Sequence, residues 1–317
     1  MALGEFGLIE RFFTRPSKRR DVLLGVGDDA ALLEMPPGRA LVAATDTLVE
    51  GRHFLAGAPG SSVGHQALAV NLSDLAAMGA EPAWALLSLS LPEVREDWLG
   101  DFARGFYALA GASGVDLVGG DTVRGPLVVT VEVLGFVEPA AALRRSGARP
   151  GDLLYVSGSP GEAAAGLEAL RRGASMGDDD PLVRRYLFAT PRLELGRALR
   201  GRASAAVDVS DGLLGDLAKL CAASGVGARL DLDALPVSER LAAARGREDS
   251  EHLVLSGGDD YELLFTLPAL EAARLETELG ATCAVTRIGE IVQGGSVRCE
   301  RDGLAVEVAG RGYDHFA

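Results

Sequence analysis

Residues 205–223 read AAVDVSDGLLGDLAKLCAA, an apolar run followed by a leucine-rich helical pattern. The run at 205–209 predicts a buried strand, and the spacing of leucines over 211–223 predicts a helix. Asp208 ends the predicted strand and Asp211 opens the predicted helix, with Ser210 between them as a candidate cap. A strand that leads directly into a helix is the building unit of α/β proteins, so this stretch indicates the fold class.

Strand and helix patterns alternate along the rest of the chain. Strand patterns lie at 41–45, 83–91, 127–137, 153–157 and 261–267, and on both sides of a hairpin turn at 301–303. Helical patterns lie at 64–78, 96–112, 162–172 and 181–200. A connector at 144–152 with a Pro-Gly turn separates the two halves. We therefore expect an α/β (α+β) protein with one domain over 1–138 and an α/β domain over 139–317.

The composition describes an ordinary globular protein of two domains. The chain has 317 residues, 48% of them hydrophobic, and a formal net charge of −14. This charge argues against a nucleic-acid partner, because nucleic-acid-binding domains present a basic face to the phosphates. Three cysteines without CxxC spacing indicate neither a disulfide framework nor a zinc site. The N-terminal residues lack a signal-peptide pattern and no apolar run approaches about 18 residues, so we expect a cytoplasmic protein that does not cross a membrane.

Aspartates adjoin glycine at several places in the sequence. The segments are Gly27-Asp28-Asp29, Gly119-Gly120-Asp121, Asp208-Val209-Ser210-Asp211-Gly212 and Gly257-Gly258-Asp259-Asp260. Carboxylates are the ligands that Mg²⁺ prefers, and glycine lets backbone approach a phosphate closely. Asp208 and Asp211 lie where a phosphate docks at a helix N-terminus, and they would repel it unless Mg²⁺ lay between. The pattern predicts metal-bridged polyphosphate chemistry; the simpler alternative for this pair is a turn residue and a charge at a helix N-terminus.

Further polar residues occupy positions where sites occur in sheet proteins. Asp46 and Asp121 follow apolar runs, so we expect both at strand ends, where either one alone would also fit an ordinary turn. Asn71 and Asp74 are three residues apart and share one face of the predicted helix. That face is expected to line a cleft, with a solvated helix face as the alternative.

Several common catalytic patterns are absent from the sequence. It contains no Gly-x-x-x-x-Gly-Lys-Ser/Thr loop, no protein-kinase motif set and no Gly-x-Ser-x-Gly elbow. The four histidines show no zinc-binding spacing. Arg144 and Arg145 are candidates for binding phosphate. The alternative is that both side chains are solvated in the connector. Polyphosphate must therefore be held by something other than a P-loop.

Taken in order, these motifs closely resemble the thiamine-monophosphate kinase family over nearly the whole chain. The matching segments are Gly25–Leu32, Thr45–Phe54, Ala67–Ala80, Gly119–Thr122, Asp208–Leu213, Ser256–Leu263 and Gly312–Phe316. The Asp-rich motifs recur in a wider superfamily with aminoimidazole ribonucleotide synthetase and selenophosphate synthetase, whereas the segments around His53 and Tyr313 look particular to the kinase. The family often has Gly-Gly-Glu-Asp where this chain has Asp259 after two glycines, so the side chain here has a shorter reach.

The resemblance implies a fold, a reaction and a set of site residues. It implies a ferredoxin-like N-terminal domain with a mixed sheet that pairs with a second subunit, and an α/β C-terminal domain that completes the active site. The implied reaction is ATP-dependent phosphorylation of thiamine monophosphate to thiamine diphosphate by direct in-line transfer, assisted by several Mg²⁺ ions. The implied metal ligands are Asp28, Thr45, Asp46, Asp74, Asp121, Asp208 and Asp211, with Asp208 and Asp211 also catalytic. The implied nucleotide contacts are Thr45, Gly120, Asp121, Arg145 and Ser210, and the implied thiamine contacts are His53, Asp259 and Tyr313.

Two other functions compete with this interpretation. A related ATP-dependent synthetase would activate an acceptor other than a phosphate; selenophosphate synthetase typically needs a reactive cysteine near its N-terminus, and the first cysteine here is Cys221. A Ca²⁺-binding module would need its acids in one Asp-x-Asp-x-Asp-Gly loop, whereas here they are dispersed. An acceptor phosphate is already ionised at neutral pH, so a kinase of this kind needs no general base, in keeping with the lack of a catalytic His or Ser pattern.

Overall fold

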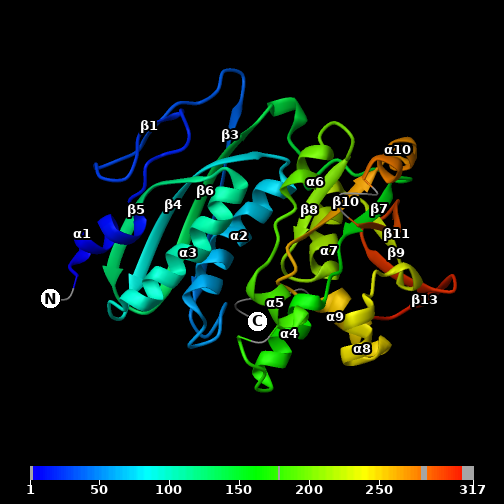
Figure 1. The fold of residues 1–317 in the computed structure, drawn as a ribbon. Helices are drawn as coiled ribbons and strands as arrows, with labels where there is room; N and C mark the ends of the chain where they lie inside the picture. Colours follow the sequence, from blue (N-terminus) through cyan, green and yellow to red (C-terminus); the bar gives the residue numbers. More distant parts are fainter. Residues whose placement is uncertain (1–2, 178, 280–283, 309–317) are drawn as a thin grey trace. The chain divides into compact units, whose positions relative to one another are not determined.

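The computed structural model of the chain describes residues 3–177, 179–279 and 284–308. Contacts between residues divide the chain into an N-terminal unit, Met1–Leu75 with Ala80–Ala140, and a C-terminal unit, Ala76–Gly79 with Ala141–Ala317. Each unit has a sheet and helices of its own (Figure 1). None of the helices in the described ranges has the apolar length that crossing a bilayer requires.

The N-terminal unit is built on a four-stranded mixed sheet in the order β3-β6-β4-β5. The strands are β3 (Ala40–Val49), β4 (Glu81–Leu91), β5 (Asp116–Arg124) and β6 (Val128–Val137). β4 and β5 are parallel, whereas β6 is antiparallel to both of its neighbours. β3, β4 and β5 thus run in the same direction. Helix α2 (Gly60–Ala77) connects β3 to β4, helix α3 (Glu96–Ser113) connects β4 to β5, and both lie against one face of the sheet (Figure 1).

Short elements precede this sheet in the chain. They are α1 (Glu5–Leu8), the π-helical turn η1 (Ile9–Phe13), and the paired strands β1 (Val22–Leu24) and β2 (Leu32–Leu33). Val22 and Leu33 of these strands pack against the core cluster that contains Trp84. Other apolar side chains of the sheet stay exposed, among them Leu41 of β3 and Val123 of β5.

Helices α2 and α3 approach each other backbone to backbone. A Cβ on Gly105 of α3 would lie 1.9 Å from the carbonyl oxygen of Ser61, and a Cβ on Gly64 of α2 would lie 2.2 Å from that of Phe102. Any side chain at either position would overlap the opposite helix. Glycine on both helices therefore determines how closely they pack over the sheet.

The C-terminal unit is a seven-stranded sheet in the order β13-β12-β9-β11-β7-β10-β8. Its strands are β7 (Leu153–Ser157), β8 (Ala205–Val209), β9 (Gly227–Asp231), β10 (Glu262–Leu267), β11 (Val285–Val292), β12 (Val297–Arg301) and β13 (Leu304–Val306). Its helices are α4 (Glu162–Arg171), α5 (Pro181–Leu187), α6 (Leu193–Ala198), α7 (Leu213–Ser224), α8 (Glu239–Arg245), α9 (Arg247–Ser256) and α10 (Ala269–Leu279). Only the β9–β12 pair is parallel among these described strands.

Helices cover the C-terminal sheet on both faces. Leu264 of β10 shares one core cluster with residues of α7 and α9, whereas Leu263 and Phe265 of the same strand share another with residues of α6 and α10. Every residue of β8 and β10 is buried. Because both faces are covered, these strands are mostly apolar rather than alternating, with Asp208, Glu262 and Thr266 as their buried polar residues. The apolar stretches make the strands recognisable in the sequence.

The mixed α/β fold class predicted from the sequence is confirmed, and three local predictions are wrong. The single helix expected over 181–200 is two helices, because Pro191 lacks an N–H and restricts the residue before it. Asp46 and Asp121 lie inside β3 and β5 rather than at their ends. Asn71 does not face a cleft: it is fully buried, and its Nδ2 donates to the carbonyl oxygen of Ala67 within α2.

We expect Gly105→Ala to lower the free energy of unfolding by about 1–3 kcal/mol, because the added methyl group must push α3 away from α2. Urea denaturation of the purified variant measures this. The matched control is Gly111→Ala in the same helix, where the nearest atom to a new Cβ is the Nζ of Lys18 at 3.8 Å. That variant should be neutral or stabilised by up to about 1 kcal/mol, since alanine favours a helix over glycine. Equal destabilisation by both would contradict the close-packing argument.

Candidate functional site

Two loops of the C-terminal unit, together with the end of strand β8, carry four of the predicted site residues. The first loop joins β8 to α7 and contains Ser210 and Asp211; Asp208, which is 5% exposed, is the penultimate residue of β8. The second joins α9 to β10 and contains Asp259. β8 and β10 are antiparallel neighbours, with Val209 opposite Glu262. The end of one strand and the start of the other therefore lie together.

Backbone hydrogen bonds join these two loops. The N–H of Asp259 donates to the carbonyl oxygen of Ser210 at 3.0 Å, and the N–H of Tyr261 donates to that of Val209 at 2.9 Å. A Cβ on Gly258 would lie 2.5 Å from the same Ser210 oxygen, so glycine is needed for the approach. Asp259 (φ +64°) and Tyr261 (φ +51°) both adopt left-handed backbone conformations. The structure thus brings Asp208, Ser210, Asp211 and Asp259 together in one unit.

Asp216 holds the Ser210–Asp211 loop in shape. One of its carboxylate oxygens, Oδ2, accepts hydrogen bonds from the backbone N–H groups of Ser210 and Asp211, both at 3.0 Å. Its other oxygen, Oδ1, accepts from Nζ of Lys219 at 2.8 Å, and the same ammonium lies 2.5 Å from Oδ2 of Asp211. Burial raises the pKa of Asp216, opposed by Lys219 and by the N–H of Asp211. Asp216 was not predicted from the sequence, where its only signal is an acid in the first turn of α7.

Asp259 lies in an environment that disfavours its charged form. Burial raises its pKa to about 6; a hydrogen bond from Tyr261 opposes this shift, and the negative charge of Asp211 adds to it. The hydroxyl of Tyr261 donates to Asp259 over a long 3.4 Å. A positively charged group bound next to Asp259 would therefore favour its ionisation.

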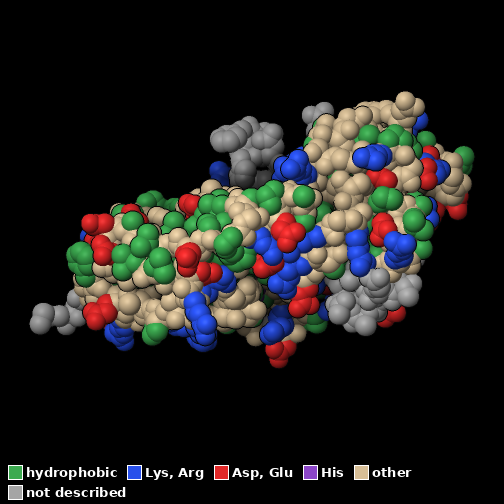
Figure 2. Space-filling model, turned by 90° about the horizontal axis from the view of Figure 1, so that it is seen from above, with side chains coloured by type: hydrophobic (Ala, Val, Ile, Leu, Met, Phe, Trp, Pro, Cys, Tyr) green, Lys and Arg blue, Asp and Glu red, His purple; other side chains and the backbone are tan. Residues whose placement is uncertain are grey.

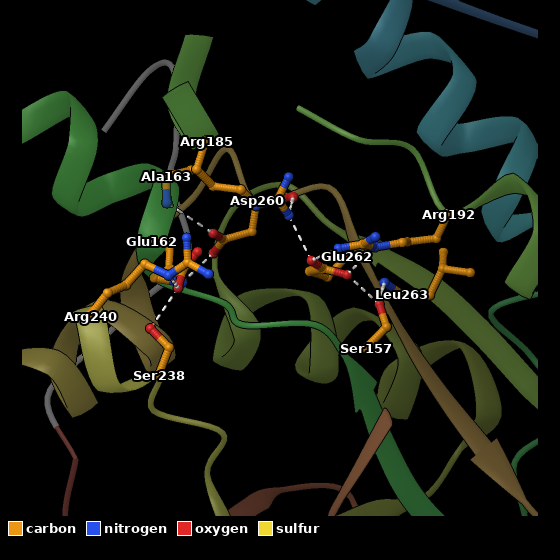
Figure 3. Close-up of polar contacts among 11 residues, drawn as sticks. Ser157, Glu162, Ala163, Arg185, Arg192, Ser238, Arg240, Asp260, Glu262 and Leu263 are labelled. Carbon is orange, nitrogen blue, oxygen red and sulfur yellow. Dashed lines mark hydrogen bonds and ion pairs between the residues drawn. The ribbon is translucent and has the colours of Figure 1, made fainter. Parts of the chain in front are cut away.

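A buried ionic cluster around Glu262 follows the Asp259 loop in the chain (Figure 3). Glu262 is fully buried and accepts hydrogen bonds from Ser157 Oγ at 2.5 Å, from Arg185 Nη2 at 2.6 Å, and from Nε and Nη2 of Arg192 at 2.6 and 2.5 Å. Arg185 Nη2 also donates to the carbonyl oxygen of Asp260 at 2.6 Å. Burial opposes ionisation of Glu262, but Arg192 and Arg185 outweigh it and hold its pKa below the usual value. None of these supporting roles was predicted from the sequence.

Asp260 attaches the same loop to helix α4 (Figure 3). Its carboxylate is fully buried and accepts hydrogen bonds from the backbone N–H groups of Gly161 at 2.7 Å and Ala163 at 3.3 Å, at the start of α4. These groups have no partner within the helix, so the aspartate satisfies them. The loop is therefore fixed at Asp259 by the backbone hydrogen bond to Ser210, and at the next residue by the bonds of Asp260 to α4.

In the N-terminal unit, a cavity of about 780 Å³ brings together a second group of predicted residues. It is lined by Asp28 and its neighbours, by Gly120 and Asp121 of β5, and by apolar side chains such as Leu86 and Leu134. Gly120 has φ +153°, and a Cβ there would lie 1.9 Å from the carbonyl oxygen of Leu87. A glycine-rich, partly acidic wall facing an apolar one suits a nucleotide better than an inorganic ion.

Thr45 and Asp46 lie in β3, the edge strand opposite to β5, which contributes Gly120 and Asp121 to the cavity wall. Asp46 is opposite Val131 of β6, Val131 is opposite Leu87 of β4, and Leu87 is opposite Gly120 of β5. β3 and β5 are thus the two edges, separated by three strand spacings or roughly 14 Å. The sheet of one chain does not bring Asp46 and Asp121 together.

The remaining predicted residues occupy separate places. His53 lies in a turn after β3, and its Nδ1 accepts from the N–H of Val49 at 3.0 Å, so that Nε2 carries the proton. Asp74 lies in α2. Arg145 is exposed in the connector, where its carbonyl oxygen accepts from Ser224 Oγ. Tyr313 lies outside the described residues.

The carboxylates fit a metal that is shared with a ligand. Within either unit, the described residues contain no group of three or more His, Cys, Asp or Glu side chains placed to hold a metal ion. Mg²⁺ in nucleotide enzymes usually binds through one or two carboxylates and completes its shell with water and phosphate oxygens. Asp208 with Asp211, and Asp28 with Asp121, are donor sets of that size and chemistry.

The chain is similar to proteins of one family along its whole length. The N-terminal domain model of "AIR synthase related protein" matches residues 27–137, and the C-terminal domain model matches residues 149–302. A thiamine-monophosphate kinase from Salmonella typhimurium is 48% identical, covering 100% of this chain and 99% of that protein. The crystal structure of a thiamine-monophosphate kinase from Stenotrophomonas maltophilia has a TM-score of 0.85 at 46% identity, covering 91% and 93% of the two chains. A structure of AaThiL complexed with AMPPCP and TMP has a TM-score of 0.78 at 32% identity, covering 100% and 99%.

Replacing Glu262 by Gln should lower the free energy of unfolding by about 3 kcal/mol at pH 7, because two arginines lose the charge that compensates them. Glu300→Gln, which removes a partly exposed partner of Arg229, is the control and should cost less than about 1 kcal/mol. The pKa of Glu262 in the folded protein lies below its ordinary value of 4.5. Its contribution to the free energy of unfolding is therefore complete above pH 4.5, and is lost as the pH falls through the pKa of the folded protein. Urea denaturation at pH 7 and pH 3.5 measures both effects; a difference between wild type and E262Q that grows toward low pH would contradict this account.

Proposed function

The chain belongs to the thiamine-monophosphate kinase family of AIR synthase related proteins, and we propose that it transfers the γ-phosphoryl group of ATP to thiamine monophosphate. The products are ADP and thiamine diphosphate. Support comes from the AaThiL relative, which aligns with the whole chain and was solved with AMPPCP and TMP. The acceptor is a phosphate, so the reaction forms a P–O–P bond.

The observation that carries the proposal is the packing of the Asp208–Asp211 loop against the Asp259 loop. The family resemblance assigns Asp208 and Asp211 to metal and Asp259 to thiamine. In the C-terminal unit these residues are connected through the hydrogen bond from Asp259 N–H to the Ser210 carbonyl. The residues proposed to bind the phosphates and the residue proposed to bind the acceptor are thus neighbours in this unit, which supports transfer between two bound substrates.

The residues proposed to hold Mg²⁺ are Asp28, Thr45, Asp46, Asp74, Asp121, Asp208 and Asp211. Bound there, Mg²⁺ would offset the repulsion between the two anionic substrates and the charge of the transferring group. Asp216 keeps the backbone of Ser210 and Asp211 fixed, so that their oxygens need not reorganise during transfer. His53, whose Nδ1 accepts from the N–H of Val49, is proposed to contact the thiamine moiety. Thr45, Gly120, Asp121, Arg145 and Ser210 are proposed to contact the nucleotide.

Transfer is proposed to be direct and in line. The acceptor phosphate is ionised at neutral pH and is itself the nucleophile, so neither a general base nor a phosphorylated side chain is needed. Tyr313, outside the described residues, is proposed to contact thiamine with His53 and Asp259.

We also propose that the chain acts as a homodimer in the cytoplasm. The face of the N-terminal sheet that α2 and α3 leave open gathers hydrophobic side chains (Figure 2), including Leu41 at 53% and Val123 at 48% exposed. Patches of this kind mark interaction surfaces. The edges that carry Asp46 and Asp121 do not meet within one sheet, whereas edges from two copies of the chain can. The small number of cysteines, of which Cys221 and Cys299 are free among the described residues, fits a reducing compartment.

The proposed function is tested by measuring ADP released from Mg-ATP with thiamine monophosphate, with unphosphorylated thiamine, and with no acceptor. We expect stoichiometric ADP and thiamine diphosphate with the monophosphate alone, because the alcohol of thiamine would need a base that the site does not offer. γ-labelled ATP without acceptor should leave the protein unlabelled. A comparable kcat/KM for thiamine, or a stable phosphoprotein, would refute direct transfer to the phosphate.

Asp208→Asn should lower kcat by roughly 10²-fold or more while leaving the circular dichroism spectrum unchanged, because it removes a preorganised charge at the site. Asp211→Asn should behave in the same way. Asp249→Asn is the control: this residue is 67% exposed on α9 and lies 4.0 Å from Arg245, so its kcat should match the wild type. A near-normal kcat for Asp208→Asn would contradict the proposed catalytic role of Asp208.

A further inference from the structure

Lysine is rare in this chain, and one of its lysines lies in the aspartate cluster. Of 31 Lys and Arg residues only two are lysines, Lys18 and Lys219. Lys18 is exposed in the N-terminal unit. Lys219 lies on α7, where its Nζ is 2.5 Å from Asp211 Oδ2 and 2.8 Å from Asp216 Oδ1. The only lysine of the C-terminal unit therefore occupies a position between two carboxylates.

The chemistry of this position suits an ammonium group. An ammonium is a compact point charge with three rotatable donors, whereas a guanidinium is a planar fork that needs a wider space. Asp216 already uses its Oδ2 for two backbone N–H groups and offers only Oδ1 to a cation. The ammonium bridges that oxygen and one oxygen of Asp211.

We propose that Lys219 is the resident cation of Asp211, and that a divalent cation binding at Asp211 displaces its ammonium, which stays on Asp216. The inference rests on the proposed function only in taking Asp211 as a metal ligand. A divalent ion and an ammonium repel each other and cannot share one carboxylate oxygen at contact distance. Asp216 retains the displaced group, because its Oδ1 lies on the side away from the loop N–H groups that Oδ2 binds.

Such an exchange gives the lysine a definite role in the site. Without metal, Lys219 offsets the mutual repulsion of Asp211, Asp216 and the nearby Asp259, so that Asp211 is held in place before metal arrives. The ammonium also competes with the metal, which weakens metal binding. The pair is partly exposed, 43% for Lys219 and 31% for Asp211, so the competition is mild. A purely structural salt bridge would instead persist when metal binds.

Selective ¹³C-lysine labelling tests the displacement directly. The chain has two lysines, so the full-length protein gives two sets of ε-CH₂ signals, and Lys18→Arg assigns them. Spectra are recorded in EDTA, with Mg²⁺ alone, with AMPPCP alone, and with both. We expect the Lys219 signal to shift in the arms that contain Mg²⁺, the Lys18 signal to stay in place, and Asp211→Asn to abolish the Mg²⁺-dependent shift. An unmoved Lys219 signal at a Mg²⁺ concentration that saturates binding would overturn the proposal.

Metal affinity supplies the second measurement. Lys219→Gln should tighten Mg²⁺ binding, followed by calorimetry, about two- to fivefold, the factor that corresponds to a partly exposed ion pair. Lys18→Gln is the matched control and should leave the Kd unchanged. Weaker or unchanged binding in Lys219→Gln, or equal Mg²⁺ binding by wild type and Asp211→Asn, would overturn the exchange. Neither measurement involves thiamine monophosphate, so a chain that exchanges the cations but fails to phosphorylate that acceptor would refute the proposed function and leave this inference standing.

Discussion

The antiparallel pairing of β8 with β10 is the constraint on which the candidate site depends. It places the end of one strand against the start of the other, so two loops separated by about 50 residues in sequence share a pair of backbone hydrogen bonds. Each loop is then fixed by a buried carboxylate of its own: Asp216 binds N–H groups in the first, and Asp260 ties the second to α4. The backbones that carry Asp211 and Asp259 are therefore fixed by other residues, Asp216 and Asp260. This allows the like charges of Asp211 and Asp259 to lie close together.

The sequence predicted elements best where burial is uniform. β8 was expected over 205–209 and has those bounds, because both faces of the strand are covered and every residue of the run except Asp208 is apolar. The same criterion ended two strands of the N-terminal unit too early. Its sheet has one open face, so β3 continues through alternating polar residues such as Thr45 and Thr47, and Asp46 lies within the strand instead of after it.

The candidate site was predictable in its acidic residues and not in what holds them. Glycine next to aspartate is a local pattern, and the residues it singled out in the C-terminal unit do lie together. Glu262 is 105 residues from Ser157 and 77 from Arg185 along the chain, and no local pattern connects such partners. Asp216 looks like any acid near a helix start. An aspartate that binds backbone N–H groups, such as Asp216, cannot be distinguished in the sequence from one proposed to bind a metal, such as Asp211. Only the tertiary structure distinguishes the two.

The left-handed backbone at Asp259 also bears on why this chain has aspartate where its family often has glutamate. Among residues with a side chain, aspartate and asparagine enter this region most readily, because their short polar groups can bond locally. Glutamate at φ +64° would extend further toward a ligand, but from a backbone that resists the conformation. The shorter acid gives up about one methylene of reach and gains a loop that rests in its working shape. The reach of the acid at this position is then decided by the conformational preference of the main chain as much as by the length of the side chain.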